Sequence, residues 1–283
     1  MSVRGVSSAA VLALLLAGCG SQAEVAAPSA TVPSGSLPAA HIHGVAVDPQ
    51  DGARLLATHD GLFRIGSDGA STRVGPVIDL MGFAVAGPGH FLASGHPGAE
   101  VDLPQPVGLI ESTDGGQTWE ALSRQGTSDF HALTTSESGV LAYDGGLMRS
   151  TDGQTWEPLE IPAPPATLAA SPDGSQVLAT TPQGLLRSTD AGTSWSPVEG
   201  APLLQVVDWT DRGSDVVGVD PAGQVWRSAD SGATWEQGMA LDSAPQAVSV
   251  TATDEGGQVL VVTTAALLES RDGGRTFDVV LEH

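Results

Sequence analysis

A short motif that recurs five times constrains the fold of this chain more than any other feature of its sequence. The copies read STDGGQTW, STDGQTW, STDAGTSW, SADSGATW and SRDGGRTF, and they begin at residues 112, 150, 188, 228 and 270. The intervals between their starts are 38, 38, 40 and 42 residues, and a short apolar stretch precedes each copy. A period of this length indicates an array of supersecondary units, each of which buries its faces against its neighbours.

Each repeat contains four short stretches that read as strands separated by turn residues. In the unit whose motif copy begins at residue 188, these stretches are residues 166–171, 176–181, 184–188 and 194–199. A degenerate sixth copy, GLFRIGSDGAS from Gly61, keeps a strand and a turn but lacks the aromatic residue. Six such units fit between His41 and His283. The sequence therefore predicts an all-β chain, a six-bladed β-propeller of four-stranded blades. We expect the blade that contains FDVVLE to close the ring by pairing with the N-terminal strand.

The five copies are similar to the Asp-box, or BNR, repeat of sialidase-like β-propellers, whose pattern is S-x-D-x-G-x-T-W. The resemblance covers nearly all of residues 41–283, although the second copy lacks one residue and the fifth ends in Phe277. It implies that the aspartate accepts hydrogen bonds from backbone amides of the turn, that the glycine has a positive φ, and that the aromatic ring packs between sheets. Structural roles are therefore expected for Asp114, Asp152, Asp190, Asp230 and Asp272 and for Trp119, Trp156, Trp195 and Trp235.

The first twenty residues have the form of a secretion signal. Arg4 precedes the apolar run AAVLALLLAG, and LAGC ends at Cys19, the only cysteine of the chain. This stretch resembles a bacterial lipoprotein signal, which implies cleavage before Cys19 and a lipid on its thiol; an ordinary secretory peptide is the alternative. We expect a signal peptide over 1–18, a lipidated cysteine and flexible tether over 19–40, and a propeller over 41–283. The expected location is the extracytoplasmic face of the bacterial cell membrane.

The charge balance is strongly acidic. Thirty-three acidic residues face eleven arginines, no lysine is present, and the formal net charge is −22. Phosphate binding needs clustered basic residues, so nucleic acid is excluded as an expected partner. An acidic surface suits solvation, cation attraction or a basic protein partner.

The histidines show a pattern once the repeats are aligned. The first strands of the first three units begin HIHGVAV, DLMGFAV and DFHALTT, so His43, Met81 and His131 share one position. Two residues earlier, on the same strand face, stand His41, Asp79 and Asp129. Because the first strand of each blade surrounds the central channel of a propeller, we expect these side chains to meet at the channel mouth.

Two further histidines fall in the turn between the second and third strands, which lies on the same face. These are His59 in the first unit and His96 in the second, where an insertion rich in proline and glycine follows. His90 is expected on the opposite face. Imidazoles beside a thioether favour a transition metal, with copper preferred over zinc. The predicted metal ligands are His41, His43, His59, Met81, His96 and His131. A polar structural site or a small-ligand site is the alternative.

The sialidase chemistry that the repeat resemblance suggests is not recognisable. It requires three arginines, a Tyr/Glu pair, an acidic residue and an Arg-Ile-Pro signature, yet this chain has one tyrosine, Tyr143, and no Arg-Ile-Pro. Four of the eleven arginines, Arg64, Arg149, Arg187 and Arg227, share one third-strand register that faces away from the axis. Asp79 and Asp129 are the carboxylates that a glycosidase could use. Glycoside hydrolase is the only enzyme class with support, and whether the chain is an enzyme stays undecided.

A non-catalytic interaction module is the remaining alternative. Asp-box propellers also occur in sortilin-type receptors and photosystem assembly factors, where the resemblance implies binding of peptides or proteins. We expect a monomer, held at the membrane through Cys19, with room for a protein or glycan partner on the face that carries the histidines.

Overall fold

The structure is a computed structural model that describes residues 1–2, 31–32, 35–39, 41–254 and 257–283. The predicted signal peptide and Cys19 lie outside the described residues. Within the described part of the chain, the secondary structure consists of strands, and they form six antiparallel sheets. No helical segment of this part has the length and apolar character that crossing a bilayer requires.

The six sheets are blades that each use consecutive strands. Blade one contains β2 (Ile42–Val47), β3 (Arg54–Thr58), β4 (Gly61–Ile65), β5 (Ser71–Val74) and the short β1 (Thr31–Val32). Blade two contains β6 (Ile78–Gly87), β7 (His90–Pro97), β8 (Leu109–Ser112) and β9 (Glu120–Ser123). Blade three contains β10 (Ala132–Ser136), β11 (Gly139–Tyr143), β12 (Leu147–Ser150) and β13 (Glu157–Leu159).

The second half of the chain repeats this arrangement. Blade four contains β14 (Thr167–Ala170), β15 (Val177–Thr181), β16 (Gly184–Ser188) and β17 (Ser196–Pro197). Blade five contains β18 (Val206–Trp209), β19 (Val216–Val219), β20 (Gln224–Ser228) and β21 (Glu236–Ala240). Blade six contains β22 (Pro245–Thr251), β23 (Gln258–Thr263), β24 (Ala266–Ser270) and β25 (Asp278–Glu282).

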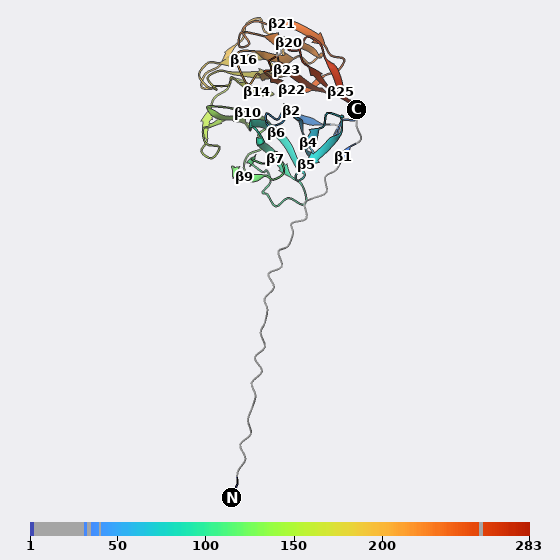
Figure 1. Ribbon diagram of the computed structural model, residues 1–283. Helices are drawn as coiled ribbons and strands as arrows, with labels where there is room; N and C mark the ends of the chain where they lie inside the picture. The colour runs from blue at the N-terminus through green and yellow to red at the C-terminus, as the bar shows by residue number, and fades with distance from the viewer. Residues whose placement is uncertain (3–30, 33–34, 40, 255–256) are drawn as a thin grey trace.

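The first strands of the blades form a closed ring. Each contacts the first strand of the next blade, and β22 of the last blade contacts β2 of the first. Figure 1 shows β2, β6, β10, β14 and β22 in the middle of the molecule, with β9, β21 and β25 at its edge. The prediction of a six-bladed β-propeller is therefore confirmed.

The Asp-box turns have the predicted structural role. In the copy of blade four, the amide and hydroxyl of Ser194 donate to the Asp190 carboxylate at 2.8 and 2.6 Å, and Ser188 donates at 2.8 Å. These hydrogen bonds lower the pKa of Asp190 to about 2. Gly192 has a φ of +84°, and a Cβ there would meet the Leu141 side chain of the preceding blade at 3.3 Å. The Asp-box turn of blade four therefore packs closely against blade three.

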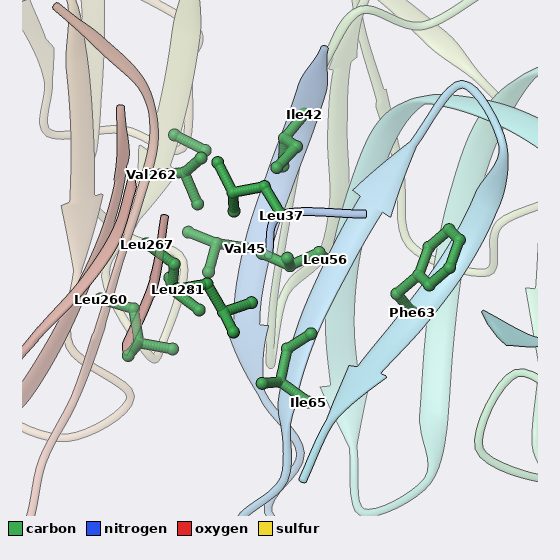
Figure 2. Packing of buried hydrophobic residues seen from close by; sticks show 11 residues of the cluster. Leu37, Ile42, Val45, Leu56, Phe63, Ile65, Leu260, Val262, Leu267 and Leu281 are labelled. Carbon is green, nitrogen blue, oxygen red and sulfur yellow. The ribbon is translucent and has the colours of Figure 1, made fainter. Parts of the chain in front are cut away.

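Apolar side chains fill the seams between blades. Each of the six core clusters combines residues of two neighbouring sheets, and the Asp-box aromatics Trp119, Trp156, Trp195, Trp235 and Phe277 pack at the edges of five of them. The seam between blades one and six lacks such an aromatic because the first repeat is degenerate. There Leu37, 8% exposed, packs with Leu281 and Val262 instead (Figure 2).

The N-terminal segment closes the ring across this seam. The amide of Leu37 donates to the Glu282 carbonyl at 2.8 Å, and the Glu282 amide donates to the Gly35 carbonyl at 2.9 Å. Ser36 and Glu282 form a parallel bridge, while β1 pairs with β5 of blade one. The ring is thus closed between the last blade and the N-terminal segment, as expected, but through an isolated bridge at Ser36 and not through an N-terminal strand.

Candidate metal-binding site at the channel mouth

The strand register places three predicted ligands at one equivalent position. Gly44, Gly82 and Ala132 pair with equivalent second-strand residues, so the residues just before them, His43, Met81 and His131, occupy the same place in blades one to three. β-bulges in β2 and β6 fall at this place and leave His43 and Met81 outside the regular pairing. All three line the central channel.

His43, His59 and Asp79 form the tightest group. The Nε2 atoms of His43 and His59 lie 3.2 Å apart, and His59 Nδ1 lies 2.7 Å from Asp79 Oδ1. Ligand atoms of these three residues all fall within 4.8 Å of one another, the one such group of three found among the described residues. The His41 ring centroid lies 5.5 Å from that of His59. Blades one and two supply every member.

The two Nε2 atoms lie within hydrogen-bond distance of each other, and their spacing also matches that of two ligands on one metal ion. Nitrogens at about 2.0–2.1 Å from a tetrahedral ion are roughly 3.3 Å apart, and the observed separation is 3.2 Å. A carboxylate on the other nitrogen of a ligating histidine fixes the ring and raises its basicity. Asp79 stands in this position relative to His59. The donor set therefore fits a divalent transition-metal ion.

The surroundings of His43 favour the neutral form of its imidazole. Burial lowers its pKa below the usual value of 6.5, and the neighbouring imidazoles of His59, His131 and His41 lower it further, while the Asp79 carboxylate opposes them. A neutral imidazole presents a lone pair to a metal, whereas a protonated one does not. The surroundings of His43 thus reduce competition from protons.

A second group lies beside the first. His96 Nε2 and His131 Nε2 are 3.2 and 2.8 Å from the same Asp129 oxygen, Oδ2. The backbone amide of Asp129 donates to the Asp144 carboxylate at 3.2 Å. His96 is also the register partner of Asp79 across β6 and β7, which makes the two groups neighbours.

Some polar atoms of the rim are buried without an aligned partner. They are Asp129 Oδ1 and His96 Nδ1. Buried polar atoms in native proteins nearly always have hydrogen-bond partners, ordered water or an ion. Ordered water or a bound ligand is what completes the bonding of such atoms.

All six predicted ligands thus lie at one end of the channel, in two groups rather than one. His43 and His59 belong to the first group, with His41 at its edge, and His96 and His131 belong to the second. Met81, which falls between His59 and His96 in the sequence, also lines the channel. His90, expected elsewhere, contacts Glu111 at 2.7 Å in blade two.

Sequence reasoning placed Asp79 and Asp129 at the mouth but did not include them among the ligands. Their position two residues before Met81 and His131 was the available signal. It missed Asp208, a carboxylate of the channel wall in blade five, because the surrounding string LQVVDWT has no histidine and no motif.

The insertion of blade two is anchored beside the site. Val107 is fully buried, and Val101 and Leu103 pack on the core between blades one and two. The Val107 amide donates to the Gly95 carbonyl at 2.9 Å, next to His96. This packing fixes the loop that follows the His96 strand.

The arginines do not assemble a carboxylate-binding site. Arg64, Arg149, Arg187 and Arg227 occupy one third-strand register, as predicted. Arg64, for example, binds both oxygens of Asp51 at 2.7 and 2.6 Å. In the described part of the chain, no arginine lines the channel.

Comparisons with known proteins agree with this architecture. A family model described as BNR/Asp-box repeat matches residues 110–121. The chain is a six-bladed β-propeller that carries BNR/Asp-box repeats. No curated protein matches its sequence.

Solved structures share the fold at low identity. "YCF48 bound to D1 peptide" is 18% identical with a TM-score of 0.55, over 89% of this chain and 85% of that chain. A chain of the nidogen/laminin complex is 13% identical with a TM-score of 0.61, over 82% of this chain and 93% of that chain. AFV00434, an ancestral GH74 enzyme, is 13% identical with a TM-score of 0.56, over 89% of this chain but 39% of its own length. The likeness concerns the fold.

Proposed function

We propose that this protein is a surface lipoprotein whose propeller binds a divalent transition-metal ion at the channel mouth. His43 Nε2 and His59 Nε2 are the primary ligands, Asp79 holds His59 by its other ring nitrogen, and His41, Met81, His96 and His131 surround them. The observation that carries the proposal is the 3.2 Å separation of the two Nε2 atoms, with Asp79 2.7 Å behind His59. The metal is held outside the membrane for trafficking, sensing or protection.

Copper is the preferred ion. For a given nitrogen and oxygen donor set, Cu(II) binds more tightly than Zn(II) or Ni(II). The rim adds further imidazoles, which suit copper, and the thioether of Met81, which favours Cu(I) in particular. We therefore expect Cu(II) to displace Zn(II) from the site.

Metal analysis of the untagged full chain tests the proposal. One equivalent of copper is expected after incubation with CuSO4 and desalting, and the His43→Ala/His59→Ala double variant should retain less than a tenth of it. His90→Ala, which removes a histidine outside the rim, is the matched control and should retain one equivalent. Equal copper in the wild type and in the double variant would refute the site.

The lipid anchor requires its own test, because the segment around Cys19 lies outside the described residues. Its support is the sequence alone: Arg4, the apolar run and LAGC. We expect the Cys19→Ser chain to lose its lipid by mass spectrometry and to leave the membrane fraction. Retention of the variant in that fraction would contradict anchoring through this thiol.

Peptide or protein binding on the same face is a second candidate function. Two structures with this fold are YCF48 bound to a D1 peptide and a chain of a nidogen/laminin complex. The net charge of −22 favours a basic or extended partner. A partner that co-purifies with the wild type and with the metal-free double variant would support this function independently of metal.

A glycosidase is less well supported by the geometry. Asp79 and Asp129, the candidate carboxylates, are both engaged with histidines, Asp129 with two of them. Turnover of aryl glycosides that is lost in Asp79→Asn and Asp129→Asn would restore this candidate.

A further inference from the structure

The interior of the channel contains a carboxylate that the metal site does not use. The channel encloses about 560 Å³ and is walled by the first strands of all six blades. Asp208, the third residue of β18, belongs to this wall together with Ser249 of β22 and Thr134 of β10. A cavity of this volume is in the range of small-molecule sites.

Asp208 joins blade five to blade six. Its Oδ2 accepts a hydrogen bond from the Val250 amide at 2.8 Å. The register places Thr134 at the equivalent position of blade three, where its hydroxyl accepts from the Ala170 amide of the next blade at 3.3 Å. The remaining blades carry small neutral residues there: Ala46, Ala84, Ala169 and Ser249. A hydroxyl group is enough to form this hydrogen bond between blades. The negative charge of Asp208 is therefore not needed for it.

This charge has no cation beside it in the described structure. Asp211, which also lines the channel, lies 3.7 Å from the Arg212 guanidinium and is half exposed. Asp208 has backbone amides as its partners and takes part in no ion pair among the described residues. Enclosure raises its pKa to about 7, and the nearby Asp211 charge contributes. The ionised form therefore lacks compensation that a positive guest would supply.

We propose that the channel binds a small organic cation through a primary ammonium group, with Asp208 as its anionic anchor. An ammonium group donates three hydrogen bonds, and Ser249 of the neighbouring blade six lines the same cavity as Asp208. A metal ion fits Asp208 less well, because the group of three metal-binding side chains among the described residues does not include it. The site is separate from His43, His59 and Asp79.

The binding depends on pH in a defined direction. Below pH 7 Asp208 takes up a proton and loses the charge that attracts the ammonium, so affinity falls from pH 8 to pH 5.5. The other titratable groups of the channel are Asp211, which faces Arg212, and the rim residues His43 and His131. Protonation of the two histidines acts in the same direction, so a variant of Asp208 is required to assign the effect.

Calorimetric titration of the metal-free full chain with n-butylamine tests the proposal, with n-butanol as the uncharged control. Saturable binding of butylamine at pH 8 is expected, with affinity at least tenfold lower at pH 5.5 and no binding of butanol. Asp208→Asn keeps an acceptor for the Val250 amide and should lower affinity at least tenfold. Asp208→Thr, which copies Thr134, should behave in the same way.

Equal affinity of butylamine for the wild type and for both variants would overturn the proposal, and so would the absence of saturable binding to the wild type. Thermal unfolding of each variant shows whether it is folded. A parallel titration with Nα-acetyl-lysine amide separates two sources of the ammonium group. Binding of both compounds points to a lysine side chain of a partner, and binding of butylamine alone points to a free amine. Copper binding should be unchanged in both variants, which separates this site from the proposed metal site.

Discussion

The two halves of the ring share one architecture and differ at one channel position. In blades one to three this position holds His43, Met81 and His131; in blades four to six it holds Ala166, Gln205 and Gln246. The two glutamines connect neighbouring blades. Gln205 donates to the Pro245 carbonyl at 2.6 Å, and Gln246 accepts from the Ile42 amide at 3.2 Å.

The difference teaches that a propeller mouth can serve stability or chemistry at the same backbone position. A glutamine reaches the backbone of the next blade and satisfies it. A histidine at that position turns instead to other imidazoles and to carboxylates, and leaves buried polar atoms such as Asp129 Oδ1 unsatisfied. In the proposed function, a change of side chain at this position places the metal site on a repeated fold.

The largest effect is expected when a histidine of the first half is replaced by glutamine, the residue at the equivalent position of blades five and six. His43→Gln should weaken copper binding at least a hundredfold, about 3 kcal/mol, because a ligand nitrogen is lost. Chelator-competition titration measures the affinity. His90→Gln is the control and should bind as the wild type does. A loss of less than threefold in His43→Gln would remove His43 from the site.

A glycine beneath the rim should be nearly as sensitive. A Cβ on Gly82 would lie 2.3 Å from the Phe130 carbonyl oxygen of blade three, so Gly82→Ala should lower the free energy of unfolding by about 2–3 kcal/mol. The equivalent residue of blade six is Ala247, and Ala247→Gly should cost only about 0.5–1 kcal/mol. Urea denaturation compares the two variants, and equal losses would contradict the close approach in blade two.

The glutamines of the second half should matter for stability and not for metal. Gln246→Ala removes the acceptor of the Ile42 amide, so we expect a loss of about 1 kcal/mol in the free energy of unfolding and unchanged copper affinity. Urea denaturation and copper titration of the same preparation provide both values. Weakened copper binding at unchanged stability would show that the two halves are not separate in role.

The smallest effect should be common to both halves. Hydrogen bonds from the Thr234 hydroxyl and amide lower the pKa of Asp230 to about 2, and the pKa of Asp114 is lowered in the same type of turn. A lowered carboxylate pKa stabilises the fold above pH 3.8 and loses this contribution as the pH falls toward 2. The midpoint of thermal unfolding should therefore decline between pH 4 and pH 2.

Replacement of either aspartate by asparagine should make this decline shallower. The effect should be similar for Asp114→Asn in the first half and for Asp230→Asn in the second. A decline that is unchanged in both variants would show that these turns do not govern the acid sensitivity of the fold.

Much of the fold could be predicted from local sequence. The Asp-box copies specify their turns through residues that bond within eight positions, as Asp190 and Ser194 do. Their period then determines the number of blades. The closure of the ring by residues 35–37 could not be predicted in detail from the sequence. Leu37 takes the place of the missing aromatic residue only through its packing with Leu281 between the first and last blades.

The sequence predicted at which end of the channel the candidate site lies, but not which of its side chains contact one another. Alignment of repeats brought the rim histidines to one end of the channel. It could not decide that His59 would face Asp79 and His43 while His96 and His131 would share Asp129, because bulges and cross-blade distances set these partners.

The sequence by itself determined the repeat, its turns, its blade number and the end of the channel where imidazoles gather, since each depends on spacing along the chain. Tertiary structure alone decided which side chains meet, that His43 and His59 approach within 3.2 Å, and that Asp208 stands enclosed in the channel wall. These outcomes arise because closing six sheets around an axis fixes distances between residues that no local interaction connects.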